Sequence, residues 1–119
     1  MDGLGETMHD TKLWEILVPY HDNDGVVYEL SHHHDWDDMV RGVAKGMTIL
    51  RSTTKGEWVS PQGEIFVDKM IPVRIMATYD QMSRIADFTL KHYNQKAVMY
   101  YVVSEQVVIR QAHFDYNSP

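Results

Sequence analysis

This chain of 119 residues contains two amphipathic segments, each with its apolar residues on one face. The first predicts a helix over Asp35–Lys45, because apolar residues recur at the spacing of one helical face: Trp36, Met39, Val40, Val43, Ala44 and Met47. The second starts at Thr78, which forms a capping-box pattern with Gln81, and ends near Asn94. A helix with one apolar face must bury that face against another layer of structure.

The start of the first helix has several suitable residues. Ser31 and Asp35 both suit the N-cap, and the acidic residues Asp37 and Asp38 suit the first turn, where carboxylates interact favourably with the helix dipole. We expect Gly46 at the C′ position that ends this helix.

The stretches around the two helices predict short strands. They lie at Leu13–Pro19, Val26–Leu30, Met47–Leu50, Gly56–Ser60, Glu64–Asp68, Met70–Ala77, Ala97–Val103 and Gln106–Arg110. A turn at His21–Gly25 and a type I turn that begins at Ser60 separate some of them. Without the accessory hairpin arms the order is βαββαβ. This order predicts an α+β, ferredoxin-like sandwich with both helices on one face of an antiparallel sheet.

The second face of this sheet needs a cover. Trp14 and Ile16 alternate with Leu13 and Leu17, so the first strand is apolar on both faces, whereas the helices cover only one. We therefore expect a second subunit on the other face, and a homo-oligomer. The domain is expected over residues 13–111, with flexible tails at 1–12 and 112–119, because the ends are polar and lack periodicity.

Composition excludes several function classes. A net charge of −6 argues against general nucleic-acid binding, which uses a basic face. The absence of cysteine excludes disulfides, thiolate catalysis and Cys-based metal sites. No apolar run is long enough for a membrane span or a signal peptide, so we expect no membrane association and a cytoplasmic location. We expect no cofactor.

The run His32–His34 attracts attention as a candidate site. Three adjacent histidines cannot converge on one metal ion, and no other histidine completes a ligand motif, so we predict no metal site. His33 and His34, near the start of the first helix, are candidates for ligand contacts. The alternative is that one ring packs under the sheet while the others are solvated.

The hairpin between Lys55 and Glu64 combines a tryptophan, a cation and two carboxylates. Trp58 suits stacking on a flat ring, and Lys55 and Arg51 suit contact with an anion. Glu57 and Glu64 are candidate catalytic carboxylates. The alternative is an ordinary hairpin whose tryptophan covers the edge of the core.

Asp68 precedes an otherwise apolar strand that contains Arg74. Partial desolvation would raise the pKa of this carboxyl group and suit it to proton handling, so Asp68 is a candidate catalytic residue and Arg74 a candidate ligand contact. The alternative is a salt bridge from Asp68 to Lys69, to Arg74 or to a partner chain.

With these residues in view, the chain resembles the small bacteriophage S-adenosylmethionine lyases, formerly called hydrolases, from about Trp14 to Ile109. The segments that carry the resemblance are Met70–Ile75, the helix through Ile85, Ala86 and Tyr93, the strand that follows Gln95 up to Tyr101, and Ser31–His34 followed by Met39 and Val40.

The resemblance implies a PII-like fold, a homotrimer and a ligand bound in clefts between subunits. It also implies a reaction that splits S-adenosylmethionine into methylthioadenosine and homoserine lactone without water. The family's important polar residues are a glutamate just before the strand and a tyrosine on the preceding hairpin. The matching positions here hold Asp68 and Trp58.

Three functions follow as hypotheses. The first is an oligomeric S-adenosylmethionine lyase. The second is a non-catalytic PII-like protein that binds an adenosyl or nucleotide ligand, as a sensor or as a phage sponge that sequesters a signalling nucleotide in the host cytoplasm. The third is a protein-interaction domain whose hairpin contacts a partner.

Overall fold

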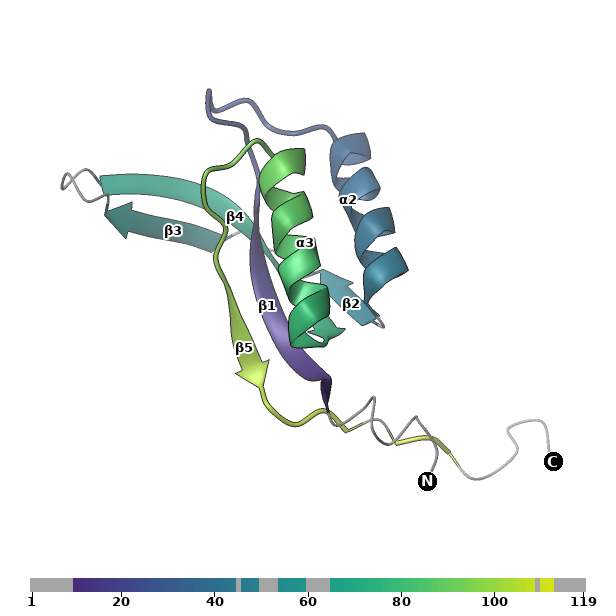
Figure 1. Cartoon of the computed structure of the whole chain (residues 1–119). Helices are drawn as coiled ribbons and strands as arrows, with labels where there is room; N and C mark the ends of the chain where they lie inside the picture. The colour runs from purple at the N-terminus through teal and green to yellow at the C-terminus, as the bar shows by residue number, and fades with distance from the viewer. Residues whose placement is uncertain (1–9, 45, 50–53, 60–64, 109, 113–119) are drawn as a thin grey trace.

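The computed structural model describes residues 10–44, 46–49, 54–59, 65–108 and 110–112, without the side chains of residues 47–49, 54–59 and 65–68. The elements in chain order are β1 (Lys12–Pro19), α2 (Leu30–Val43), β2 (Gly46–Ile49), β3 (Thr54–Val59), β4 (Ile65–Ala77), α3 (Tyr79–His92) and β5 (Tyr100–Ser104). The helices α2 and α3 lie side by side on one face of the sheet (Figure 1). This is the predicted ferredoxin-like α+β plan, so the fold-class prediction is confirmed.

The sheet has the order β2-β4-β1-β5, and β3 also pairs with β4. Every pairing is antiparallel. The 13-residue strand β4 organises this sheet, because it pairs with β1 along one edge and with β3 and then β2 along the other. Beyond the helices, β3 and β4 continue as a two-stranded ribbon that projects from the body (Figure 1).

The core lies between the sheet and the helices. Alternate residues of β1 and β4 point into it, and α2 and α3 contribute the facing side chains. Its largest fully buried members are Trp36, Tyr93, Ile16, Ile75, Met82, Ile85, Val18, Val40 and Val73. The capping box of Thr78 and Gln81 is present at the start of α3, as predicted, so α3 begins where the sequence places it.

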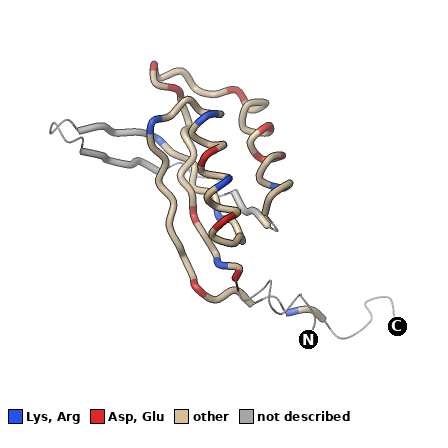
Figure 2. Tube along the Cα trace, in the orientation of Figure 1, with Lys and Arg blue, Asp and Glu red and all other residues tan. Residues whose placement is uncertain are grey.

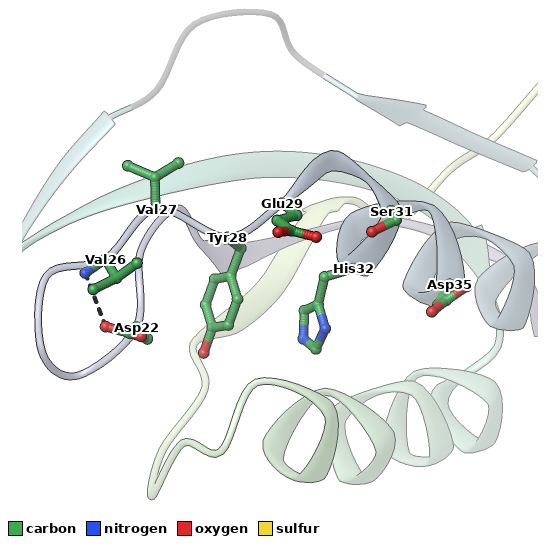
Figure 3. A pocket seen from close by; sticks show the side chains of 8 residues that line it. All are labelled: Asp22, Val26, Val27, Tyr28, Glu29, Ser31, His32 and Asp35. Atoms are coloured by element: carbon green, nitrogen blue, oxygen red, sulfur yellow. Dashed lines mark hydrogen bonds between the residues drawn. The ribbon is translucent and has the colours of Figure 1, made fainter.

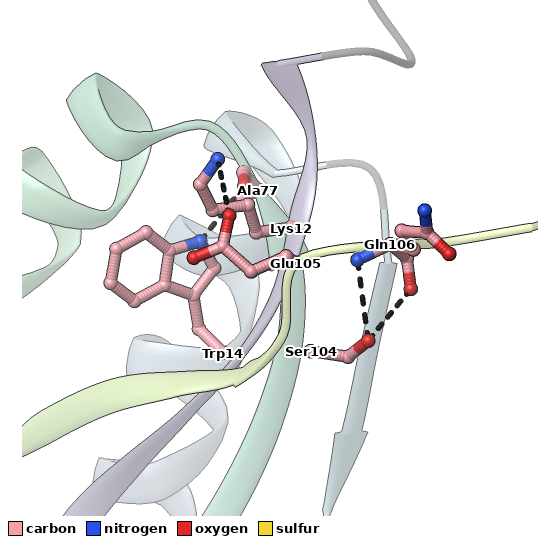
Figure 4. A network of polar contacts seen from close by, with 6 residues as sticks. All are labelled: Lys12, Trp14, Ala77, Ser104, Glu105 and Gln106. Carbon is pink, nitrogen blue, oxygen red and sulfur yellow. Dashed lines mark hydrogen bonds and ion pairs between the residues drawn. The ribbon is translucent and has the colours of Figure 1, made fainter.

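Polar contacts at the end of the sheet hold β1 and β5 in place (Figure 4). The Trp14 indole N–H donates to the Ala77 carbonyl at 2.9 Å, which ties β1 to the end of β4. Lys12 and Glu105 form an ion pair at 3.6 Å beside it. The Ser104 hydroxyl donates to the Gln106 carbonyl, which turns the chain away after β5.

The prediction of a strand at Val26–Leu30 is wrong. Only an isolated bridge between His21 and Val27 is present, and Leu30 is the first residue of α2. The helix starts earlier than expected because the His32 and His33 rings pack against Tyr93 at the end of α3. Its N-cap is Glu29, without a side-chain cap, rather than Ser31 or Asp35.

Three further boundaries differ. The predicted strands Glu64–Asp68 and Met70–Ala77 are one strand, because Pro72 lies between the stretch paired with β3 and the stretch paired with β2, where its missing N–H is tolerated. Gly46 begins β2 rather than following the helix. Residues 106–108 and 110 form no strand. The turn at Ser60 and the first nine residues lie outside the described part of the chain, and the division into tails and one domain stays a prediction.

No helix in the described part of the chain is long and apolar enough to cross a membrane.

The turn after β1 is as predicted: the Asp22 side chain accepts from the backbone N–H groups of Asp24 and Val26 at 2.9 Å, and Gly25 has a φ of +83°. That positive φ is the left-handed conformation that glycine adopts without steric cost.

One buried hydrogen bond joins the two helices, and it gives the first prediction. The Trp36 indole N–H donates to the Thr89 hydroxyl at 2.9 Å, and that hydroxyl donates to the Ile85 carbonyl. Thr89→Val should lower the free energy of unfolding by about 1–3 kcal/mol, because the indole N–H loses its acceptor in a dry site. Urea unfolding measures the loss.

Thr89→Ser is the matched control, because it keeps the hydroxyl and removes only a methyl group. It should cost clearly less than Thr89→Val. Equal losses for the two variants would mean that packing of the methyl group, not the hydrogen bond, holds the helices together.

Candidate functional site

A column of stacked rings joins the start of α2 to the end of α3. The His32 and His92 rings are 3.9 Å apart and nearly parallel. Tyr28 stacks on the outer side of His32, and Phe88 stacks on the outer side of His92. Tyr93 meets His32 edge to face from the side. The histidine run therefore fixes the position of α2 on α3, and the first ring of the run is structural.

Reciprocal hydrogen bonds strengthen this contact. The His32 Nε2 lies 2.8 Å from the His92 carbonyl oxygen, and the His92 Nε2 lies 2.7 Å from the His32 carbonyl oxygen. A carbonyl oxygen only accepts, so each ring carries its proton on Nε2. The bond to His92 also satisfies a carbonyl at the C-terminus of α3 that has no partner inside the helix.

His33 faces the other side of Tyr93. Its Nδ1 lies 2.7 Å from the Tyr93 hydroxyl, and the Tyr93 ring is fully buried. Burial lowers the pKa of His33 below its ordinary value of 6.5, with a further contribution from neighbouring His32. Burial also raises the pKa of Tyr93, so this hydroxyl keeps its proton. The pair is a neutral, hydrogen-bonded unit between the helices.

Two hollows flank the start of α2. The first, of about 310 Å³, is a shallow depression between the loop after β1 and the first turn of α2 (Figure 3). Its lining combines the Tyr28 and His32 rings with three carboxylates, those of Asp22, Glu29 and Asp35. Figure 2 shows further acidic residues along α2. This face therefore favours cationic over anionic groups.

The second hollow, of about 180 Å³, lies between α2 and the sheet. Its walls are apolar and come from both layers: Val18 of β1, Ile71 and Val73 of β4, and Leu30 and Trp36 of α2. We call this hollow the α2–sheet pocket. It is narrower than the first hollow and lined mostly by side chains of the core.

Four polar residues complete the α2–sheet pocket: His33, His34, Asp37 and Tyr93. Asp37 is 6% exposed, and burial raises the pKa of its carboxyl group, while Arg41 acts in the opposite direction. Sequence analysis assigned Asp37 only a favourable interaction with the helix dipole. The signal for its burial was its position one residue after Trp36 and four after His33, on the flank of the apolar stripe.

A separate polar cluster lies on the face of the sheet that the helices leave uncovered. Glu15 is only 8% exposed there and accepts from the Arg74 Nε at 3.3 Å and from the Tyr101 hydroxyl. The register explains this meeting, because Glu15 pairs with Arg74 on β4 and with Tyr101 on β5. Glu15, a charged residue in the middle of an otherwise apolar stretch of β1, is a second residue that sequence analysis missed.

The register also separates the predicted hairpin residues. Gly56 pairs with Asp68, and Trp58 pairs with Phe66. Since alternate positions of a strand share a face, positions 58 and 68 fall on one face of the ribbon and positions 55 and 57 on the other. The side chains at all four positions lie outside what the structure describes, and so do Arg51 and Glu64 entirely.

The structure thus brings two of the predicted site residues together, His33 and His34, at the α2–sheet pocket. Arg74 lies across the sheet from them, since its neighbour Val73 points into that pocket. The Asp22 carboxylate accepts from backbone N–H groups of its own turn. Among the described residues, no group of three or more His, Asp or Glu could hold a metal ion.

Comparison with known proteins shows the class of fold. No protein-family model and no curated protein matches the sequence. Solved structures do match: a phage S-adenosylmethionine lyase in complex with S-methyl-5'-thioadenosine has a TM-score of 0.59 at 11% identity, covering 82% of this chain and 84% of that one. The resemblance expected from the sequence is therefore confirmed at the level of the fold.

CutA proteins have the same architecture. The CutA1 protein of Shewanella sp. SIB1 matches with a TM-score of 0.57 at 8% identity, over 87% of this chain and 86% of that one. The periplasmic divalent cation tolerance protein CutA from Archaeoglobus fulgidus matches with a TM-score of 0.55 at 10% identity, over 87% and 88%. The chain thus has a CutA- and PII-like fold.

The half-buried His33 gives a prediction for the pH dependence of stability. Its pKa is lower in the folded than in the unfolded chain, so below about pH 6.5 the unfolded chain binds a proton that the folded chain does not. The free energy of unfolding should therefore fall as the pH decreases from about 6.5 toward the folded pKa. His33→Gln should reduce this slope in urea unfolding.

His34→Gln is the control, because His34 is the exposed neighbour on the same turn. His33→Gln should reduce the slope more than His34→Gln does. If the pH slope of His33→Gln equals that of the unmodified protein, the assignment of this pH dependence to His33 is wrong.

Proposed function

We propose that this protein is a small PII-like oligomer that binds an adenosyl or nucleotide ligand between subunits, and that it cleaves S-adenosylmethionine to methylthioadenosine and homoserine lactone. The observation that carries the proposal is the similarity in fold to a phage lyase solved with S-methyl-5'-thioadenosine. The cytoplasmic location expected from the sequence is part of the same proposal.

The uncovered face of the sheet supports the oligomer. It presents the apolar residues Leu13, Leu17, Met76, Tyr101 and Val103, with Tyr101 and Val103 about 40% exposed. An apolar sheet face of this kind is stable when a second layer covers it. A homotrimer, as the resemblance implies, would supply that layer from copies of the same chain.

The projecting ribbon supports it as well. Between Ile65 and Lys69, β4 has left β1, and no other described strand pairs with that edge. A two-stranded ribbon is only marginally stable in water by itself. A neighbouring subunit would stabilise the ribbon and, with it, the predicted site positions at Trp58 and Asp68.

The reaction demands little catalytic machinery. One carboxylate oxygen of the substrate attacks the substrate's own γ-carbon, the bond from that carbon to sulfur breaks, and methylthioadenosine leaves with the electron pair. No water or proton enters. Positioning is the main task, and apolar surroundings favour the step because opposite charges cancel along it.

The predicted residues fit this task as follows. Arg74 would hold the substrate carboxylate, because Glu15 occupies only its Nε and leaves the remaining N–H groups to donate. Trp58 and Asp68 would lie beside the sulfonium cation, which favours an aromatic face and a carboxylate. Glu57, Glu64, Lys55 and Arg51 stay candidates for contacts from the hairpin.

Incubation with S-adenosylmethionine tests the proposed activity. Purified protein should produce methylthioadenosine and homoserine lactone in equal amounts, well above the uncatalysed rate, as measured by liquid chromatography. Asp68→Asn should reduce this rate, whereas Asp80→Asn, at an exposed position on α3, should leave it unchanged. Absence of methylthioadenosine above background would exclude the lyase.

A non-catalytic nucleotide-binding protein is the second candidate. It is favoured by Asp68 and Trp58, which stand where the lyases carry glutamate and tyrosine. If no lyase activity is found, a thermal shift with one member of a panel of adenine and other nucleotides would support this candidate. No shift with any of them would exclude it.

The oligomer has its own test. Val103→Asp puts a charge on the uncovered sheet face and should shift sedimentation from the oligomer toward the monomer, because burying an unpaired carboxylate is costly. Val26→Asp is the matched control on an exposed loop and should sediment as the unmodified protein. A monomeric unmodified protein would contradict the proposed assembly.

A further inference from the structure

The carboxyl group of Asp37 lines the α2–sheet pocket. Asp37 is only 6% exposed, and no hydrogen bond to its side chain is present in the described part of the chain. The nearest cation, Arg41, pairs instead with Asp38 at 3.3 Å. Among the described residues no fully buried side-chain oxygen or nitrogen lacks a partner, so the Asp37 oxygens are open to the pocket, where a ligand can donate to them.

The surroundings of Asp37 define what that ligand can be. The layers packed against it, β1 and β4, contribute only the apolar Val18, Ile71 and Val73 to the pocket. The titratable groups that face it are His33 and His34 on its own helix, with Arg41 and Asp38, and Tyr93 from the end of α3. The pocket therefore suits a flat apolar group that carries a few polar atoms on one edge.

The volume of the α2–sheet pocket limits the size of the ligand. Pockets that enclose a whole drug-sized ligand measure roughly 300–1,000 Å³, whereas this one measures about 180 Å³. It has room for one ring system rather than for a complete nucleoside or nucleotide. A ligand held here must extend out of the pocket, toward its mouth or toward a neighbouring subunit.

We propose that the α2–sheet pocket is the subsite for the adenine ring of the adenosyl or nucleotide ligand, with Asp37 as its specificity residue. A protonated carboxyl group accepts from the exocyclic amino group of adenine through one oxygen and donates to the adjacent ring nitrogen through the other. The apolar walls cover the faces of the ring. This inference rests on the proposed function, since it names the part of the protein that selects the base.

Two features of the site fit this pairing. Burial raises the pKa of Asp37, which favours the protonated form that the pairing needs. The His33 Nδ1 is engaged with the Tyr93 hydroxyl, which leaves Nε2 as a second polar atom for the ligand. Hydrogen bonding to the base thus uses groups that the helix contacts have already positioned.

Isothermal titration calorimetry with methylthioadenosine tests the subsite. Asp37→Leu should weaken binding by about tenfold or more, because the amino group and the ring nitrogen lose their partners. Asp37→Asn should bind within a few-fold of the unmodified protein, because a carboxamide offers the same acceptor and donor to adenine. Asp38→Asn is the matched control on the exposed side of the helix and should bind normally.

The ligand provides a second test. The 5'-methylthio derivative of purine riboside, which carries a hydrogen in place of the amino group, should bind the unmodified protein about tenfold more weakly than methylthioadenosine. Urea unfolding of each variant confirms that it folds. Loss of binding in Asp37→Asn equal to that in Asp37→Leu would overturn the base pairing and indicate a site for a cation.

The outcomes separate this inference from the proposed function. If methylthioadenosine binds Asp37→Leu as it binds the unmodified protein, the adenine subsite is wrong while ligand binding stands. If the unmodified protein binds neither methylthioadenosine nor any nucleotide, both the subsite and the proposed function are wrong.

Discussion

The central strand β1 can satisfy only one of its two faces within a single chain. Trp14, Ile16 and Val18 point toward the helices and are buried, whereas Leu13, Glu15 and Leu17 point to the uncovered side. Because a strand alternates strictly, neither set can move without the other. The position of the two helices and the charged cluster at Glu15 both follow from this alternation, and it leaves the second face for the copy of the chain proposed above.

The helices are aligned by polar contacts as much as by apolar packing. The Trp36–Thr89 hydrogen bond and the His32–His92 ring pair join α2 to α3 at two points along the helices. Both contacts lie in or near the dry core, where their geometry is strongly constrained. As a result, the first turn of α2 is held firmly, and the residues next to it, His33 and Asp37, line a pocket of defined shape.

Periodicity and capping were sufficient to predict the core order βαββαβ from the sequence. The helical stripe that begins at Trp36 and the capping box at Thr78 both report local physics, and α3 starts as expected. The start of α2 could not be predicted in this way. It depends on rings packing against Tyr93, about 60 residues away in sequence, and no local pattern reports such a contact.

At the candidate site, too, some residues were predictable from the sequence and others were not. His33 was recognisable as an unusual residue, but Asp37 looked like an ordinary acidic residue of a first turn. Its burial follows from its position above the sheet, where Ile71 and Val73 of β4 line the same pocket. Glu15 received no role from the sequence, because only the register brings Arg74 and Tyr101 beside it.

The two polar sites lie on opposite faces of one sheet, and this has a consequence for any shared ligand. Arg74 opens toward the uncovered face, whereas Asp37 opens toward the helix side. A single small ligand cannot pass through a paired sheet to contact both within one protomer. If the ligand extends from the Asp37 pocket to an Arg74 guanidinium, that arginine must belong to a second copy of the chain. A divided site of this kind would make binding depend on assembly, because a lone subunit offers only half of the contacts.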